Sequence, residues 1–205
     1  ETAFMTNRAM EFIEESKDKP WFLHLSYIKP HWPYMAPAPY HNMYSANEFY
    51  PVHRNDSERK NDHPVYKAFM ENSISKTFSK DEVRNTVLSG YMGLIKQIDD
   101  NLGRLFKFLE DAGHMEDTMI VFTSDHGDYQ GDHWLGEKEL FHEQSVRVPM
   151  IIYDPSEYAN ITRGTKEKRF VEAIDLLPTF LDAVESPVSK HRLEGNSLMP
   201  VLKGE

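Results

Sequence analysis

The chain lacks cysteine. Within its 205 residues this excludes a disulfide framework, a cysteine-ligated metal site and a thiolate nucleophile. Either redox environment tolerates a cysteine-free chain, so composition leaves the cellular compartment unknown. The sequence also contains no apolar run of about 18 residues, the length that a bilayer-spanning helix needs. We therefore expect no membrane partner.

Basic residues are in the minority, since 23 Lys and Arg stand against 33 Asp and Glu and the net charge is −10. This balance argues against nucleic acid as a partner, because the phosphate backbone requires a basic face. It does not exclude a small anionic substrate, which responds to local charge. Hydrophobic residues at 40% and aromatic residues at 12% exclude a disordered chain and suffice for a buried core.

The hydrophobic pattern predicts both helices and strands. Apolar residues at helical spacing predict helices at 2–16, 63–74, 79–113 and 175–185. Short apolar runs predict strands at 21–27, 117–124, 149–153 and 170–173. The longest helix is expected to begin with a capping box between Ser79 and Glu82. This alternation indicates an α/β fold, namely an α/β/α sandwich with a mainly parallel sheet.

Between residues 28 and 78 the periodicity breaks down. The segment is rich in Pro, Asn, Asp, His and Tyr, and only the helix predicted at 63–74 interrupts it. A connection of this length in a compact domain is usually either a functional lid or a disordered insertion. Both alternatives remain open for this segment.

The segment 124–138, SDHGDYQGDHWLGEK, carries the strongest chemical signal. It follows a predicted buried strand, and sites in α/β sheets form outside the carboxyl ends of strands. Asp125 and His126 would supply a carboxylate and an imidazole to one divalent cation, while Gly127 lets the backbone turn away. Two ligands are fewer than a catalytic metal needs. The alternative is that both residues only cap the following turn.

The same segment holds further polar residues. Asp128, Asp132 and His133 are expected to form hydrogen bonds within the loop rather than to bind a metal. Lys138 follows Asp125 by thirteen residues, and a loop that folds back could bring its ammonium group into the same cleft. There it would offset the charge of a transferred sulfuryl or phosphoryl group. The alternative for Lys138 is a solvated surface lysine.

A second cluster, Lys29-Pro30-His31-Trp32-Pro33-Tyr34, follows the strand predicted at 21–27. Two prolines stiffen the backbone on either side of His31, and a rigid support suits a proton donor that must be placed accurately. The alternative is an aromatic turn in which His31 only packs. If the strands before the two clusters are parallel, both clusters lie at the same edge of the sheet and form one site.

Four motifs in one order resemble the sulfatases of the alkaline phosphatase superfamily, and within them the phosphonate monoester hydrolase and phosphodiesterase branch. The motifs are FLHLSYIKPHWPY, YMGLIKQIDDNLGRLFKFLEDAG, IVFTSDHGDYQGDHWLGEK and SVRVPMIIY. The resemblance covers nearly the whole chain and ends at GNSLMPVLKG. It implies hydrolysis of sulfate esters or of phosphonate and phosphate esters.

The resemblance also implies roles for individual residues. Asp125 and His126 match one pair of metal ligands, Lys138 matches the lysine that contacts the sulfuryl or phosphoryl oxygens, and His31 matches a substrate-contacting histidine. Lys29 is expected to assist in substrate binding. The implied cofactor is one divalent metal ion, Ca or Mn before Zn or Fe.

One part of the family pattern is missing. Members attack with a formylglycine made in a Cys/Ser-x-Pro-x-Arg motif, which Ser186-Pro187-Val188-Ser189-Lys190 does not match. The family's other acidic metal pair is missing as well. We therefore expect residues 1–205 to be the C-terminal part of the catalytic domain, completed by an N-terminal half.

The expected partners are that N-terminal half and a small sulfate or phosphonate ester, and homo-oligomerisation is compatible with the sequence. The alternative is a non-catalytic module that binds sulfated or phosphorylated ligands without turnover.

Overall fold

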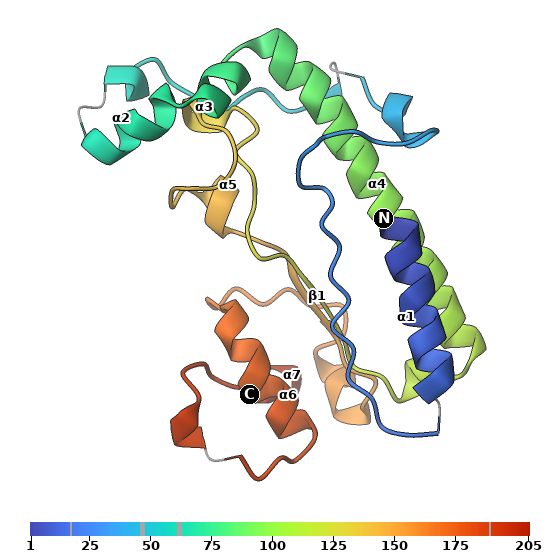
Figure 1. The fold of residues 1–205 in the computed structure, drawn as a ribbon. Helices are drawn as coiled ribbons and strands as arrows, with labels where there is room; N and C mark the ends of the chain where they lie inside the picture. Colours follow the sequence, from blue (N-terminus) through green and yellow to red (C-terminus); the bar gives the residue numbers. More distant parts are fainter. Residues whose placement is uncertain (17, 46–47, 61–62, 189) are drawn as a thin grey trace. The chain divides into compact units, whose positions relative to one another are not determined.

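The computed structural model describes residues 1–16, 18–45, 48–60, 63–188 and 190–205. The chain divides into two compact units. Figure 1 colours the ribbon along the sequence, from blue at the N-terminus to red at the C-terminus. Unit 1 comprises Glu1–Ala112 and His126–Val148, and unit 2 comprises Gly113–Asp125 and Pro149–Glu205. None of the helices in the described ranges has the length and apolar character needed to cross a membrane.

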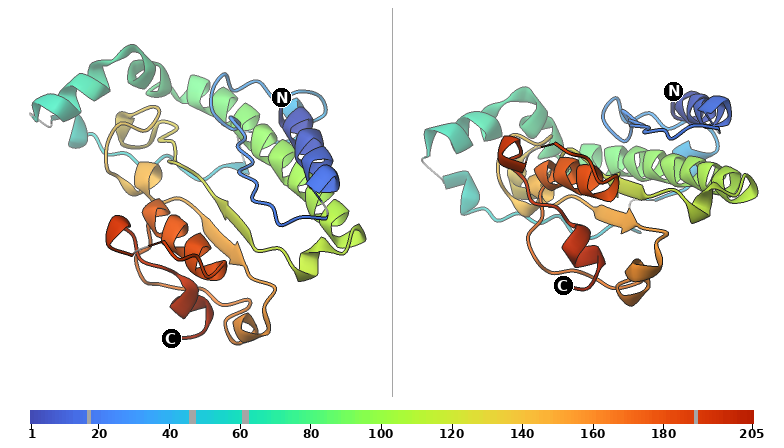
Figure 2. Two further views of the ribbon diagram at one scale, coloured as in Figure 1. Left: turned by 60° about the horizontal axis from the view of Figure 1, so that its bottom comes forward. Right: turned by 90° about the horizontal axis from the view of Figure 1, so that it is seen from below.

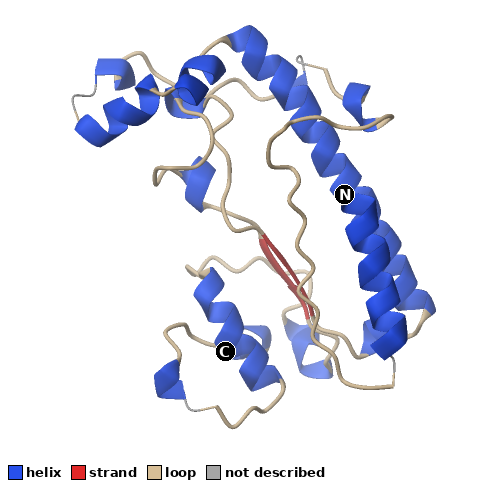
Figure 3. Cartoon of the chain, in the orientation of Figure 1, coloured by secondary structure: helices blue, strands red, loops and turns tan. Residues whose placement is uncertain are grey.

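Helices make up most of the regular structure, as Figure 3 shows. Unit 1 contains α1 (Thr2–Ser16), α2 (Pro64–Glu71), α3 (Ser73–Phe78), α4 (Asp81–Asp111) and α5 (Glu143–Val146). Unit 2 contains β1 (Ile120–Thr123), β2 (Met150–Tyr153), α6 (Leu176–Ala183) and α7 (Met199–Leu202). The helices predicted at 2–16, 79–113 and 175–185 are confirmed, and the helix predicted at 63–74 corresponds to α2 and the start of α3.

The core of unit 1 lies between α1 and α4, which run side by side in all views (Figures 1 and 2). Ala9 and Ile13 of α1 are buried, as are Leu105 and Leu109 of α4. These residues recur at helical spacing, so each helix buries one apolar stripe and leaves its polar face exposed.

The capping box predicted at the start of α4 is wrong. Lys80 occupies the N-cap position and provides no side-chain cap. Ser79 instead ends α3, because its backbone N–H donates to the Ser75 carbonyl oxygen and its hydroxyl donates to the Lys76 carbonyl oxygen. A residue that closes one helix in this way is not available to cap the next. At the other end Gly113 has a left-handed φ of 76°, as expected for a glycine that stops a helix.

The proline-rich segment after residue 28 lies against α4, and two glycines of this helix permit the approach. A Cβ atom built on Gly90 would lie 2.5 Å from the carbonyl oxygen of Tyr34, and one on Gly93 would collide with the carbonyl oxygen of Tyr40. The hydroxyl of Tyr40 donates to Asp100 Oδ2 of α4 at 3.0 Å. This part of the 28–78 segment is therefore packed on a helix, and the 3-10 turns Tyr40–Asn42 and Glu58–Lys60 add local order.

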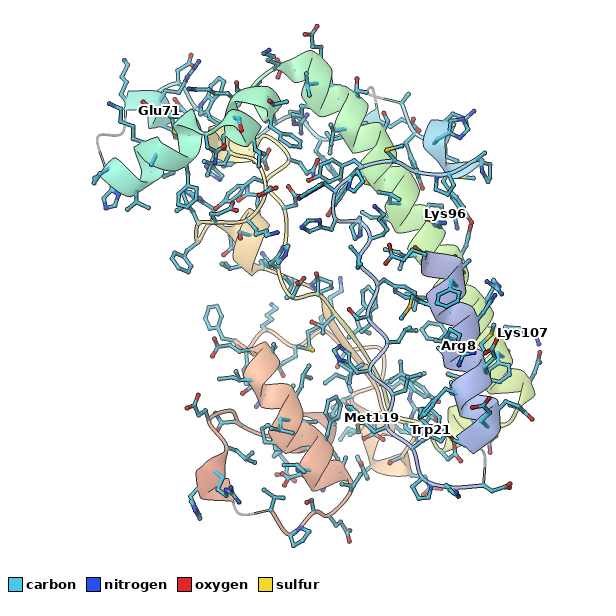
Figure 4. All side chains as sticks on the ribbon, viewed as in Figure 1. Arg8, Trp21, Glu71, Lys96, Lys107 and Met119 are labelled. Atoms are coloured by element: carbon cyan, nitrogen blue, oxygen red, sulfur yellow. The ribbon has the colours of Figure 1, made fainter. Side chains whose placement is uncertain are left out.

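The strand predicted at 21–27 is wrong. The segment is extended and its exposure alternates, with Phe22 68% exposed, but it pairs with no strand among the described residues. Trp21, labelled in Figure 4, lies edge-on to Phe12 of α1 at 6.5 Å, and the Tyr27 hydroxyl is hydrogen-bonded to Thr6 Oγ1 at 2.7 Å. Side chains of α1 hold the segment in place of a hydrogen-bonded ladder, which would require a neighbouring strand.

Unit 2 contains the described sheet. β1 and β2 confirm the strands predicted at 117–124 and 149–153, but they pair antiparallel, with Ile120 opposite Tyr153 and Thr123 opposite Met150. The mainly parallel sheet expected from the sequence is therefore not what these strands form. A parallel pair needs a crossover connection, usually a helix, whereas the chain between β1 and β2 contains only the short 3-10 turn Asp132–Trp134 and the four-residue α5.

The strand predicted at 170–173 is also wrong. Phe170 is fully exposed, and Glu172 is the N-cap of a 3-10 turn, Ala173–Asp175, that leads into α6. The Glu172 backbone N–H donates to Asp175 Oδ2 at 2.9 Å, and the two side chains form a capping box. Because these capping groups lie in and directly after the apolar run, the run leads into a helix and does not form a strand.

A histidine cluster of five side chains ties Glu58 and Tyr66 to the 129–142 segment within unit 1. It consists of Glu58, Tyr66, Tyr129, His133 and His142. The rings of His133 and His142 stack at 4.1 Å with an interplanar angle of 14°, and Glu58 Oε1 lies 2.7 Å from His133 Nδ1. The Tyr129 hydroxyl is 2.8 Å from His142 Nδ1 and accepts the His142 backbone N–H at 3.3 Å. Burial and the neighbouring His133 lower the pKa of His142.

The packing of the proline-rich segment on α4 predicts opposite effects for two glycines of this helix. Gly90→Ala should destabilise the protein by about 1–3 kcal/mol, because the new methyl group would push against the Tyr34 carbonyl oxygen. Gly103→Ala is the matched control, since nothing lies within 4 Å of its Cβ position. It should stabilise the helix by about 0.5–1 kcal/mol. Unfolding midpoints of the two variants would be compared with wild type, and a stable Gly90→Ala variant would contradict the packing.

The histidine cluster predicts a loss of stability in mild acid. The folded pKa of His142 lies below its ordinary value of 6.5, so the unfolded chain binds more protons between the two values. The free energy of unfolding should therefore fall as the pH drops below 6.5. His142→Gln should reduce this dependence, whereas replacing the exposed His41 by Gln should not. Denaturant titrations between neutral and mildly acidic pH would test this, and identical pH dependence in both variants would refute it.

Candidate active site

His31 and Lys138 meet in unit 1, although they are far apart in the sequence. Lys138 Nζ donates to His31 Nε2 at 3.0 Å, and both side chains are half-buried. His31 Nδ1 lies 3.1 Å from the Trp32 carbonyl oxygen, which can only accept, so the hydrogen of the neutral ring is on Nδ1. Nε2 then accepts from the ammonium group. The structure thus brings together the imidazole and the cation that the sequence predicted for one site.

His126 lies next to this pair. Its ring centroid is 6.3 Å from that of His31, and its Nδ1 is 2.7 Å from the Gly127 carbonyl oxygen. A carbonyl partner on Nδ1 puts the ring hydrogen there and leaves the lone pair on Nε2, which is how protein scaffolds orient a metal-binding histidine. Asp125 precedes His126 directly in the chain.

The donor set of these two neighbours fits a divalent cation, because carboxylate and imidazole both bind such ions. Across the described residues, no group of three or more His, Cys, Asp or Glu side chains is arranged to hold a metal. Metal binding by Asp125 and His126 therefore stays a prediction, and it would need ligands beyond these two residues.

Lys29 takes a different position from His31 and Lys138. Its ammonium group donates to the carbonyl oxygens of His31 at 3.3 Å and Pro33 at 2.9 Å. It thus stabilises the backbone of the turn that carries His31. A direct contact between Lys29 and substrate stays a prediction.

The loop from 126 to 138 folds back through an unusual backbone. Gln130, His133, Trp134 and Glu137 all have a positive φ, between 47° and 62°, although none is glycine. Each such residue costs about 1–2 kcal/mol relative to a right-handed conformation. The loop needs contacts from outside itself to keep this shape.

Three hydrogen bonds provide such contacts. Ser145 Oγ donates to the Lys138 carbonyl oxygen at 2.6 Å, and the Gly136 backbone N–H donates to Ser75 Oγ at 3.2 Å. Arg84 of α4, which is buried, donates from Nε to the Gln130 carbonyl oxygen at 3.0 Å. The loop is therefore fastened near its middle and at the residue that carries the ammonium group.

Carboxylates surround the loop end. Burial and repulsion from Glu139 raise the pKa of Glu137, which lies beside Lys138 in the chain. Burial also raises the pKa of Asp128, although hydrogen bonds from Tyr34 and Gln130 oppose this shift. Both carboxyl groups are therefore harder to ionise than an exposed carboxyl group.

Sequence reasoning missed two of the residues that shape this site. Tyr34 ends the proline-rich motif, and its hydroxyl donates to Asp128 Oδ2 at 2.7 Å. Burial and the charge of Asp128 raise the pKa of Tyr34, so the phenol stays protonated. Arg84 gave no signal, because a buried polar residue looks like an interruption of the apolar stripe of α4. Asp132 and His133 form hydrogen bonds, but to another segment rather than within the loop: Asp132 Oδ1 accepts the His53 backbone N–H, and His133 Nδ1 lies 2.7 Å from Glu58 Oε1.

Comparison with known proteins places this geometry in a family. A family model described as sulfatase matches residues 1–186. The multifunctional alkaline phosphatase superfamily protein PehA of Trinickia caryophylli is 36% identical, over 98% of this chain and 41% of that protein. An arylsulfatase of Clostridium perfringens is 31% identical, over 98% of this chain and 42% of that protein.

A solved structure is similar as well. The phosphonate monoester hydrolase of Agrobacterium radiobacter superposes with a TM-score of 0.90 at 31% identity, covering 99% of this chain and 42% of that chain. The chain thus spans about two fifths of the length of these relatives, and within that span it shares their fold. Together with the match over residues 1–186, this shows that the chain belongs to the sulfatase family.

Proposed function

We propose that the protein containing this chain is a metal-dependent hydrolase of sulfate esters or of phosphonate and phosphate esters. The chain would supply the electrostatic part of the active site. The observation that carries the proposal is the hydrogen bond between Lys138 and His31, 3.0 Å long, with the His126 ring 6.3 Å from that of His31. Relatives named for phosphonate and sulfate ester hydrolysis support it.

Lys138 would hold the charged oxygens of the substrate. Its ammonium group is at the end of a fastened loop, so it needs little reorganisation when negative charge develops on the tetrahedral group. At least one of its hydrogens now points to His31 Nε2 and could turn to a substrate oxygen. Such fixed donors stabilise a transition state more than solvent water does, because water would have to reorient.

His31 would handle the proton of the leaving group. In the observed arrangement Nε2 carries no hydrogen, because it accepts a hydrogen bond from Lys138 while the ring hydrogen is on Nδ1. When the ammonium group turns to a substrate oxygen, Nε2 would become free to take up a proton from solvent. His31 would then pass this proton to the departing alkoxide, which is more basic than an imidazole, and Lys138 would keep its charge. Lys29 would act indirectly, by keeping the turn of His31 in shape.

Asp125 and His126 would hold one divalent metal ion, together with ligands from the rest of the protein. Such an ion, when bound, supplies positive charge that polarises the ester oxygens. Carboxylate and imidazole suit Ca, Mn, Zn or Fe, and we place Ca and Mn first. No motif for formylglycine is present in this chain, so this nucleophile would come from the N-terminal part of the protein. That part would also complete the α/β/α sandwich with its mainly parallel sheet.

Lys138→Ala in the full-length protein tests the central proposal. We expect kcat to fall about 10²- to 10³-fold, the loss typical of removing one transition-state donor. Initial rates on an aryl sulfate and an aryl phosphonate monoester would be measured. Lys107→Ala is the control, since Lys107 forms an exposed ion pair with Asp111 on α4. Unchanged turnover in Lys138→Ala would refute its role, and ligand binding without turnover in wild type would favour the non-catalytic module.

His126→Ala should weaken metal binding. Loss of a ligand should cost at least as much affinity as loss of its hydrogen-bond partner, which is about 10- to 100-fold. Elemental analysis of the purified full-length protein would give the metal content per chain. His41→Ala, at an exposed histidine of unit 1, should retain the wild-type metal content. Equal metal content in both variants would remove His126 from the metal site.

A further inference from the structure

A second hydrogen bond joins the two segments that carry His31 and Lys138. The Tyr34 hydroxyl donates to Asp128 Oδ2 at 2.7 Å, and Asp128 Oδ1 accepts the Gln130 backbone N–H at 3.1 Å. One carboxylate is thus shared between the proline-rich turn and the folded-back loop. A shift of either segment would break at least one of these two bonds.

Contacts around the ring of Tyr34 fix the position of its hydroxyl group. The ring contacts Phe78 and Tyr91 edge-on, with centroid distances of 6.0 Å in both pairs. The Tyr34 carbonyl oxygen lies against Gly90 of α4, where even a methyl group would be too close. The direction of the hydroxyl is therefore set by α3, α4 and the turn together.

The tie lies close to the groups that would act on substrate. Tyr34 follows His31 by three residues, and the intervening turn is braced by the Lys29 ammonium group. Asp128 is on the loop whose other end carries Lys138. A tie between Tyr34 and Asp128 therefore limits how far His31 can move away from Lys138.

We infer that Tyr34 and Asp128 are positioning residues, which hold the proline-rich turn on the loop so that His31 stays in hydrogen-bond contact with Lys138. This inference rests on the proposed function for its effect on turnover. Neither side chain needs to touch the substrate. A displacement of about 1 Å in a reacting group can lower the rate about 100-fold. Loss of the one hydrogen bond that limits the displacement of His31 can therefore lower turnover.

Tyr34→Phe isolates the hydroxyl, because the phenyl ring keeps its contacts with Phe78 and Tyr91. In the full-length protein we expect kcat to fall about 10- to 100-fold, with little change in KM. Tyr40→Phe is the matched control. Tyr40 also donates to a carboxylate, Asp100 Oδ2 at 3.0 Å, but it is not tied to the loop of Lys138. It should leave kcat at the wild-type value.

A double-mutant cycle separates positioning from a general loss of stability. If Tyr34 acts through His31, then Tyr34→Phe should change kcat by no more than about twofold in a His31→Ala background. An equal loss in both backgrounds would show that Tyr34 acts independently of His31 and would overturn the inference, as would wild-type kcat in Tyr34→Phe. Asp128→Asn, which keeps the side-chain shape, should show the same dependence on His31 and replaces Tyr34→Phe if that variant does not fold.

A measurement without turnover keeps this inference distinct from the proposed function. Failure of the wild-type protein to hydrolyse any aryl sulfate or phosphonate ester would refute the proposed function. The tie would then be judged by NMR of histidine-labelled protein. Changed ring signals of His31 in Tyr34→Phe, with unchanged signals in Tyr40→Phe, would support the positioning role. Unchanged His31 signals in both variants would overturn it.

Discussion

The hydrogen bond from the Lys138 ammonium group to His31 Nε2 is the contact on which the candidate site depends. It joins a cation to a neutral imidazole whose other nitrogen is occupied by the Trp32 carbonyl oxygen. Neither partner is held by its own secondary structure, because both lie in irregular segments. The arrangement therefore depends on contacts that the two segments make with the helices around them.

The loop that carries Lys138 shows how such a contact is maintained against a local cost. Four residues with positive φ make its backbone unfavourable by itself. Hydrogen bonds between the loop and Arg84, Ser75 and Ser145 offset part of this cost, since a typical hydrogen bond contributes about 0.5–1.5 kcal/mol. The histidine cluster adds further contacts at 133 and 142. The loop is thus rigid because its surroundings specify it.

The turn that carries His31 is held in a different way, by close packing of its backbone against the backbone of α4. Glycines at 90 and 93 open the surface of α4, so that carbonyl oxygens of the proline-rich segment reach the helix itself. Lys29 braces the turn internally, and the Tyr34 hydroxyl connects it to Asp128. The long helix α4 therefore supports both halves of the site, with glycine beneath the turn and Arg84 beneath the loop.

Local patterns in the sequence determined the regular elements and the family. The apolar stripes of α1 and α4 and the runs at β1 and β2 are short-range signals, and the motifs around His31 and Asp125 are specific without any coordinates. Strands at 21–27 and 170–173 could not be decided locally. Whether an apolar run forms a strand depends on a hydrogen-bonding partner elsewhere in the chain. At 170–173 the Glu172 carboxylate instead caps the 3-10 turn that leads into α6.

Only the tertiary structure decided which polar side chains meet. Residues 21–27 form no strand, so the argument that two parallel strands bring the clusters to one edge of a sheet does not apply, yet His31 and Lys138 still come together. They do so because α4 offers surfaces for both segments. Tyr34 and Asp128 likewise look ordinary in sequence, since a hydrogen bond between residues so distant along the chain leaves no periodic trace.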